Sequence, residues 1–176
     1  DNLRLLAESA SRFEGDIRQF KWIVISAHMA AQTSLIGFLS GSAGLGAFTK
    51  DAQAKQFAWL NDYSGKTKRP NADQVADFRE LLKRATTGES FERSDVTLQL
   101  DPQHFARFEK LHWHRSRFNH LRDEGWSIEI SGVPEFIEAV HDLISHIVAD
   151  GWAFRHASDD ERDELSQLLE QLHGFT

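Results

Sequence analysis

The N-terminal part of the chain carries one continuous apolar stripe. Apolar residues recur at alternating steps of three and four from Leu3 to Val24, a spacing that places them on one face of an α-helix. The stripe passes through Gly15. The pattern therefore predicts either one long helix that continues to about Leu39 or two helices with a kink near Gly15. The glycine-rich residues 41–46 then end the helical pattern.

The rest of the chain shows the same period, divided by recognisable helix starts and stops. Helices are predicted at residues 50–63, from an N-cap at Asn71 to about Ala85, from Asp101 and Pro102 to the RDEG sequence at 122–125, from Ser131–Pro134 to Gly151, and after an N-cap at Ser158. Residues 96–100 and 126–130 alternate between apolar and polar side chains, which predicts a minor two-stranded β element. The sum is an all-α, up-and-down helical bundle.

Composition narrows both the fold and the chemistry. The chain has 176 residues, of which 40% are hydrophobic and 27% charged, as is typical of a globular domain with its own core. We therefore expect one helical-bundle domain over residues 1–176, with an acidic C-terminal helix at 157–176 docked on it. The absence of cysteine excludes disulfides, thiolate metal sites and cysteine nucleophiles. It also suits a reducing cytoplasm, where we expect the protein to be.

One segment calls for comparison with a membrane span. Residues 22–49 contain no aspartate, glutamate, lysine or arginine and are long enough to cross a bilayer. Serine, threonine, glutamine and histidine side chains interrupt the segment, and its end is rich in glycine. We interpret it as the central helix of a bundle and expect no membrane partner.

The helix predicted at 102–122 carries the candidate chemistry. Between residues 107 and 122 lie five arginine or lysine residues and three histidines, against a single glutamate, on a chain with a net charge of −7. A local basic patch on an acidic protein is what a polyanion site requires. The alternative is a solvated helix face that offsets the charge of the acidic helices.

Within this helix, the sequence RSRFNH at 115–120 places an arginine and a histidine five residues apart near the helix end. The motif resembles the signature of the HEPN family (higher eukaryotes and prokaryotes nucleotide-binding). In that signature an arginine and a polar residue are followed by several others and then a histidine, near the end of a bundle helix. Arg115, Ser116 and His120 match these positions, although the polar residue is most often asparagine in the family. The resemblance is specific over about residues 102–148 and architectural elsewhere.

The resemblance implies a metal-independent endoribonuclease without a cofactor, often the toxic half of a toxin–antitoxin or defence system. Its expected step is attack by the RNA 2′-hydroxyl, with a cyclic phosphate product. The residue types suit this chemistry, because arginine holds a phosphate through two hydrogen bonds and histidine transfers protons near neutral pH. The alternative is a catalytically silent module that mediates dimerisation or binds a nucleotide or protein partner.

The spacing of the motif bears on assembly. A five-residue step separates the side chains of Arg115 and His120 by about 140° around a helix, so one copy makes a loose pair. The resemblance implies a homodimer that brings two copies of each residue into one cleft, where RNA binds. In the structural alternative, the two residues bond to backbone carbonyls at the helix end.

Further residues are expected to support the motif. The candidate substrate-binding residues are Ser116, Arg117, Asn119 and Arg122. His28 and Gln32 lie four residues apart on one helix face, either as a buried polar pair or as the lining that positions Arg115. Glu129 is a candidate partner for an arginine of the motif helix. No metal site is expected, because neighbouring histidines are two or five residues apart and no HExxH sequence is present.

Overall fold

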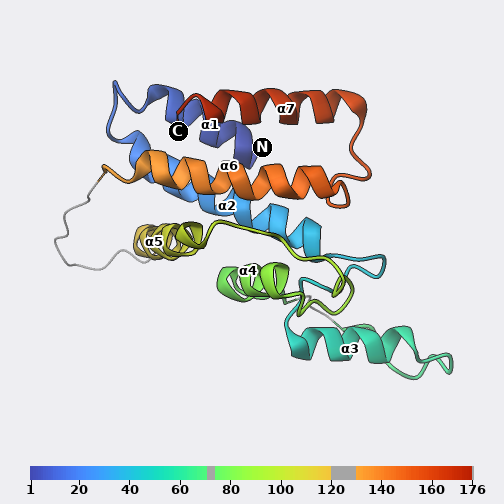
Figure 1. The fold of residues 1–176 in the computed structure, drawn as a ribbon. Coiled ribbons are helices and arrows are strands. Elements are labelled where there is room, and N and C mark those ends of the chain that lie inside the picture. Colours follow the sequence, from blue (N-terminus) through green and yellow to red (C-terminus); the bar gives the residue numbers. More distant parts are fainter. Residues whose placement is uncertain (71–73, 120–129, 176) are drawn as a thin grey trace. The chain divides into compact units, whose positions relative to one another are not determined.

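A computed structural model gives the structure of the chain and describes residues 1–70, 74–119 and 130–175. These residues form seven helices: α1 (Asn2–Arg12), α2 (Gln19–Leu39), α3 (Lys50–Leu60), α4 (Phe78–Thr87), α5 (Pro102–Asn119), α6 (Val133–Asp150) and α7 (Asp159–His173) (Figure 1). No strand occurs within those three ranges. The prediction of an all-α fold is confirmed.

The chain divides into two compact units. The first contains residues 1–34 and 99–176, and the second contains residues 35–98. In the first unit α6 contacts both α5 and α7, and α7 also contacts α1 (Figure 1). The apolar side of α6 supplies much of the core of this unit; its buried residues include Phe136, Ile137, Val140, Leu143, Ile144 and Ile147. One helical-bundle domain over the whole chain stays a prediction.

Several helix ends follow directly from local chemistry. At the start of α5, Asp101 Oδ1 accepts a hydrogen bond of 2.8 Å from the backbone N–H of Gln103. Pro102 has no backbone N–H, but no hydrogen bond is lost, because the N–H groups of the first helical turn have no partner within the helix. α7 begins with a capping box between Ser158 and Glu161. α6 ends where Gly151 adopts a left-handed conformation with φ of 79°. These ends lie where the sequence predicts them.

The apolar stripe at the N-terminus belongs to two helices. α1 ends at Arg12 and α2 begins at Gln19, with Gly15 in the turn between them. Asp16 stabilises this turn, because Asp16 Oδ1 accepts two hydrogen bonds from Arg18. The backbone N–H of Arg18 donates at 3.0 Å, and the guanidinium Nε of Arg18 donates at 2.7 Å. The two-helix alternative is therefore the observed one.

α2 has the length and composition that a membrane span requires. Its most apolar stretch has a mean hydropathy of 1.4, and 56% of that stretch is buried within the chain. Central helices of soluble bundles pass the same test, so the absence of a membrane partner stays a prediction.

The second unit corrects the predicted start of α4. The helix begins at Phe78, and its N-cap is Asp77, whose Oδ1 accepts the N–H of Glu80 at 2.9 Å. Val75, which lies within the range predicted as this helix, instead forms an antiparallel bridge with Phe48. This pairing holds the chain extended ahead of the helix. The predicted N-cap, Asn71, lies outside the described residues.

Residues 96–100 form no strand, which corrects the predicted β element. Leu98 donates its N–H to the carbonyl of Ala85 at 2.8 Å, near the end of α4, where carbonyls lack helical partners. Leu98 is buried and its two neighbours are exposed, so the alternating pattern arises from packing against a helix end. Of the predicted partner segment, residues 126–129 lie outside the described residues.

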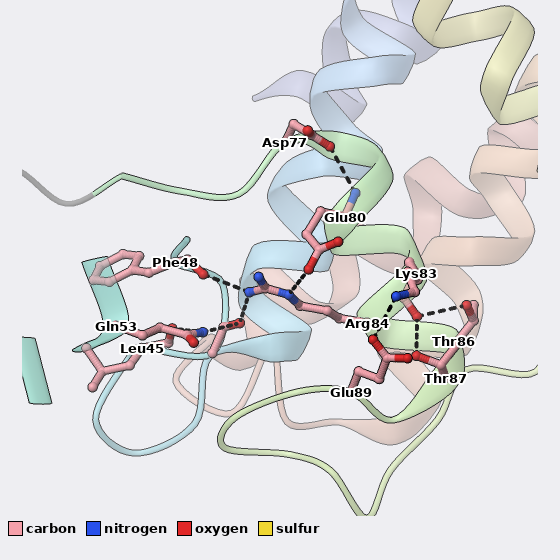
Figure 2. A network of polar contacts seen from close by, with 11 residues as sticks. Leu45, Phe48, Gln53, Asp77, Glu80, Lys83, Arg84, Thr86, Thr87 and Glu89 are labelled. Carbon is pink, nitrogen blue, oxygen red and sulfur yellow. Dashed lines mark hydrogen bonds and ion pairs between the residues drawn. The ribbon is translucent and has the colours of Figure 1, made fainter. Parts of the chain in front are cut away.

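A buried arginine joins α4 to the loop before α3 (Figure 2). Arg84 is 3% exposed, and its Nη1 donates to the carbonyls of Phe48 at 2.7 Å and Gly46 at 3.2 Å. Its Nε donates to Glu80 Oε1 at 2.8 Å. A buried charge needs this full set of partners, so Arg84 fixes the loop to the helix.

The glycine-rich loop 41–46 is closed by a carboxylate. Glu92 accepts the backbone N–H groups of Gly41 at 3.1 Å, Ala43 at 2.7 Å and Gly46 at 2.8 Å, and that of Leu45 as well. Four convergent N–H groups form a concavity that favours an anion. The loop, interpreted from sequence as a simple break, is thus a folded structure that Glu92 organises.

Candidate functional site

The candidate site is centred on two histidines from different helices. His28 of α2 and His112 of α5 place Nε2 and Nδ1 3.0 Å apart, with ring centroids at 5.2 Å. His28 is 1% exposed, whereas His112 is half-buried. Two neutral imidazoles can form this contact when one ring nitrogen donates and the other accepts. The pair therefore connects the interior of the first unit to the motif helix.

The surroundings keep His28 neutral. Burial, then the positive charge of Arg115, then His112 lower the pKa of His28 from 6.5 to about 3. Each of these causes disfavours the charged imidazolium. At neutral pH the site thus holds an uncharged histidine beside a permanently charged arginine.

Arg115 is tethered within its own helix. The amide of Asn119, one turn further along α5, has its oxygen toward the guanidinium and accepts from Nε at 3.2 Å. This orientation is assigned from hydrogen bonding. His112, Arg115 and Asn119 are spaced by three and four residues, so they share one face of α5. The structure thereby brings Arg115, Asn119 and His28 of the predicted residues into one cluster.

His114 lies on another side of α5 and is a packing residue. It is 4% exposed, and its ring lies edge-on to Phe20 at 5.4 Å and to Phe136 at 5.8 Å between centroids. Burial, followed by the charge of Lys110, lowers the pKa of His114. Histidines two residues apart on this helix therefore have different surroundings.

The remaining predicted residues are distributed around the cluster. Ser116 and Gln32 are half-buried. The Arg117 guanidinium lies 5.0 Å from the ring centroid of Trp113, a cation–π contact on the outer side of α5. The motif histidine His120 lies outside the described residues, as do Arg122 and Glu129.

Acidic partners of α5 lie on α6. Arg107 Nη1 donates to Glu138 Oε2 at 2.6 Å, and His104 Nε2 lies 3.6 Å from Asp142 Oδ2. These contacts anchor the N-terminal half of α5. The basic charge near its C-terminal end is a separate group.

Within the described ranges, no three histidine, aspartate or glutamate side chains are close enough to hold a metal ion.

His112 is the residue that the sequence interpretation missed. Its signal was the spacing of 112, 115 and 119, which indicates a shared helix face. The contact with His28 has no such signal, because the two residues are 84 positions apart.

Comparison with known proteins adds no relative. No family model matches the chain, no curated protein matches it, and no solved structure matches it.

Proposed function

We propose that the protein is a HEPN-like, metal-independent endoribonuclease that works as a cytoplasmic homodimer. The observation that carries the proposal is the cluster of His28, His112, Arg115 and Asn119 at the end of α5 that leads to His120. This cluster joins a fixed positive charge to the uncharged imidazole of His28. Such a combination suits the binding of a phosphate diester beside groups that transfer protons.

In the proposed reaction, Arg115 binds the scissile phosphate and stabilises the charge that develops on it. One His120 takes the proton from the RNA 2′-hydroxyl as the 2′-oxygen forms a bond to phosphorus. The bond from phosphorus to the 5′-oxygen breaks, and the His120 of the second copy gives that oxygen a proton. The products are a 2′,3′-cyclic phosphate and a free 5′-hydroxyl.

The histidine pair has a positioning role in this scheme. His28 holds His112, which lies three residues before Arg115 on the same helix face. Because His28 is neutral, it does not repel the guanidinium of Arg115. A bound phosphate adds negative charge nearby and so raises the tendency of His28 to bind a proton.

A homodimer through α5 is supported by exposed aromatic side chains on the outer side of this helix. Phe105 is 38% exposed and Trp113 is 46% exposed. Aromatic residues are enriched at the centres of protein interfaces. We propose that the second copy packs against α5 through these aromatic side chains.

The second candidate is a catalytically silent HEPN-like module that binds a nucleotide or a protein such as an antitoxin. The contact between Arg115 and Asn119 favours it, because a guanidinium held within its own helix already has a structural role. Ser116, at the position where the family most often has asparagine, favours it too.

Cleavage of a panel of RNAs with chelator present separates the two candidates. We expect cleavage by the wild type and a loss of about a hundredfold or more for each of two variants. Arg115→Ala removes a group that stabilises the developing charge, and His120→Ala removes a proton-transferring group. Arg155→Ala is the matched control, because Arg155 is exposed and stacks on Trp152 in another part of the first unit. Intact RNA with folded wild-type protein would favour the silent module.

A further inference from the structure

A second basic surface lies in the other unit, in the turn after α3. Lys66, Lys68 and Arg69 are all exposed. The sequence from Tyr63 to Pro70 contains no acidic residue. Lys66 and Lys68 form no ion pair with any carboxylate in the described ranges. Within those ranges no carboxylate competes with an external anion for the two lysines.

This turn is folded by its own hydrogen bonds. The Asp62 carboxylate accepts the backbone N–H of Ser64 at 2.8 Å and that of Thr67. Gly65 has φ of 69°, which a side chain would disfavour. The side chain of Ser64, followed by that of Thr67 and by their backbone N–H groups, holds the pKa of the Asp62 carboxyl far below its usual range. Its negative charge therefore faces the N–H groups of the turn, and the lysines are held by an ordered backbone.

Aromatic side chains accompany the positive charges. Tyr63 is 97% exposed, an unusual environment for an aromatic ring of this size. The guanidinium of Arg69 lies 5.3 Å from the ring centroid of Trp59, on the last turn of α3. A surface that binds single-stranded nucleic acid has two parts. Positive charges lie along the path of the nucleic-acid backbone, and the bases stack on aromatic rings.

We infer that the turn 62–70, together with Trp59, binds single-stranded RNA. The lysines contact phosphates, and Tyr63 stacks on a base. The inference rests on the proposed function for its ligand, and it assigns a substrate-holding surface separate from the α5 cluster. Charge alone would also attract an acidic peptide, but the exposed tyrosine beside the lysines favours a ligand with planar bases.

The test measures binding of a short, labelled 2′-O-methyl RNA by fluorescence anisotropy at several salt concentrations. This RNA lacks the attacking hydroxyl, so binding is measured whether or not the protein cleaves RNA. For Lys66→Ala/Lys68→Ala we expect weaker binding, and a salt slope reduced by about 1.4, since each single-strand phosphate contact contributes roughly 0.7. For Tyr63→Ala we expect a loss of roughly fivefold or more with an unchanged slope.

The matched control is Lys55→Ala/Lys83→Ala, because these two lysines of the same unit already pair with Asp51 and Glu89. We expect it to bind like the wild type. Equal affinity and slope in both double variants would overturn the inference, and so would displacement of the RNA by polyglutamate at equal charge. An unchanged affinity for Tyr63→Ala would overturn the stacking and with it the single-strand assignment. Loss of cleavage in Arg115→Ala with unchanged RNA binding would support the proposed function, and it would neither support nor overturn the inference about the turn 62–70.

Discussion

His28 and His112 meet with 3.0 Å between Nε2 and Nδ1, although 84 residues separate them in the chain. The contact fixes α5 against α2 at the position of the motif. It also places a buried histidine where protonation is disfavoured. Both consequences can be tested by experiment.

The first prediction concerns pH. The unfolded chain binds a proton at His28 below about pH 6.5, whereas the folded protein resists this until about pH 3. Stability is therefore lost as the pH falls below 6.5, by up to ~1.4 kcal/mol per pH unit from this residue. The wild type should lose stability to urea between pH 6.5 and 5, and His28→Gln should lose less. The exposed His146 provides the control His146→Gln. Identical pH dependence in wild type and His28→Gln would contradict the assignment.

The second prediction concerns the carboxylate in the loop 41–46. Glu92→Ala removes the acceptor for four backbone N–H groups, and we expect the free energy of unfolding to fall by about 2 kcal/mol or more. Glu89→Ala, three residues away, removes only an exposed ion pair with Lys83 and should change little. Chemical denaturation measures both. Similar small losses in the two variants would show that the loop folds without Glu92.

The third prediction concerns a close backbone approach in the same loop. A Cβ atom at Gly46 would lie 1.9 Å from the carbonyl oxygen of Leu39, so Gly46→Ala must displace backbone and should cost about 2 kcal/mol or more. At Gly15 the nearest atom would be 3.9 Å away. Gly15→Ala should therefore leave the melting temperature unchanged or slightly higher. A tolerated Gly46→Ala would indicate a different course of this loop.

The sequence predicts some elements well because their signals are local. Several helix ends are marked by contacts within a few residues: those of Asp101 with Pro102, of Ser158 with Glu161, and of Gly151. Such signals do not depend on the rest of the fold.

Where a tertiary contact determines the backbone conformation, the pattern of apolar and polar residues does not predict it. Val75 has helical spacing, but its bridge to Phe48 holds it extended. Leu98 alternates like a strand residue, yet it packs beside the end of α4. Glu92 gives no sequence signal at all, because its partners are backbone N–H groups about 50 residues away. The cluster around Arg115 could be predicted only in part. The spacing of its α5 residues indicates their shared helix face, whereas no sequence pattern indicates the contact with His28 of α2.

The fourth prediction concerns assembly. We expect a homodimer in sedimentation experiments, and we expect Trp113→Glu to produce a monomer because it puts a charge on the outer face of α5. Trp22→Glu is the control, since Trp22 is similarly exposed, at 49%, but lies on α2. A wild-type monomer at high concentration, or equal effects of the two substitutions, would count against the α5 interface.

The central claim is that Arg115 and His120 cleave RNA through its 2′-hydroxyl. Mass spectrometry of the fragment ends, after incubation of an RNA with the protein and a chelator, tests it most directly. The account predicts fragments that end in a 2′,3′-cyclic phosphate with the wild type, and intact RNA with Arg115→Ala. Intact RNA with the folded wild type, or the same fragments from both proteins, would contradict it.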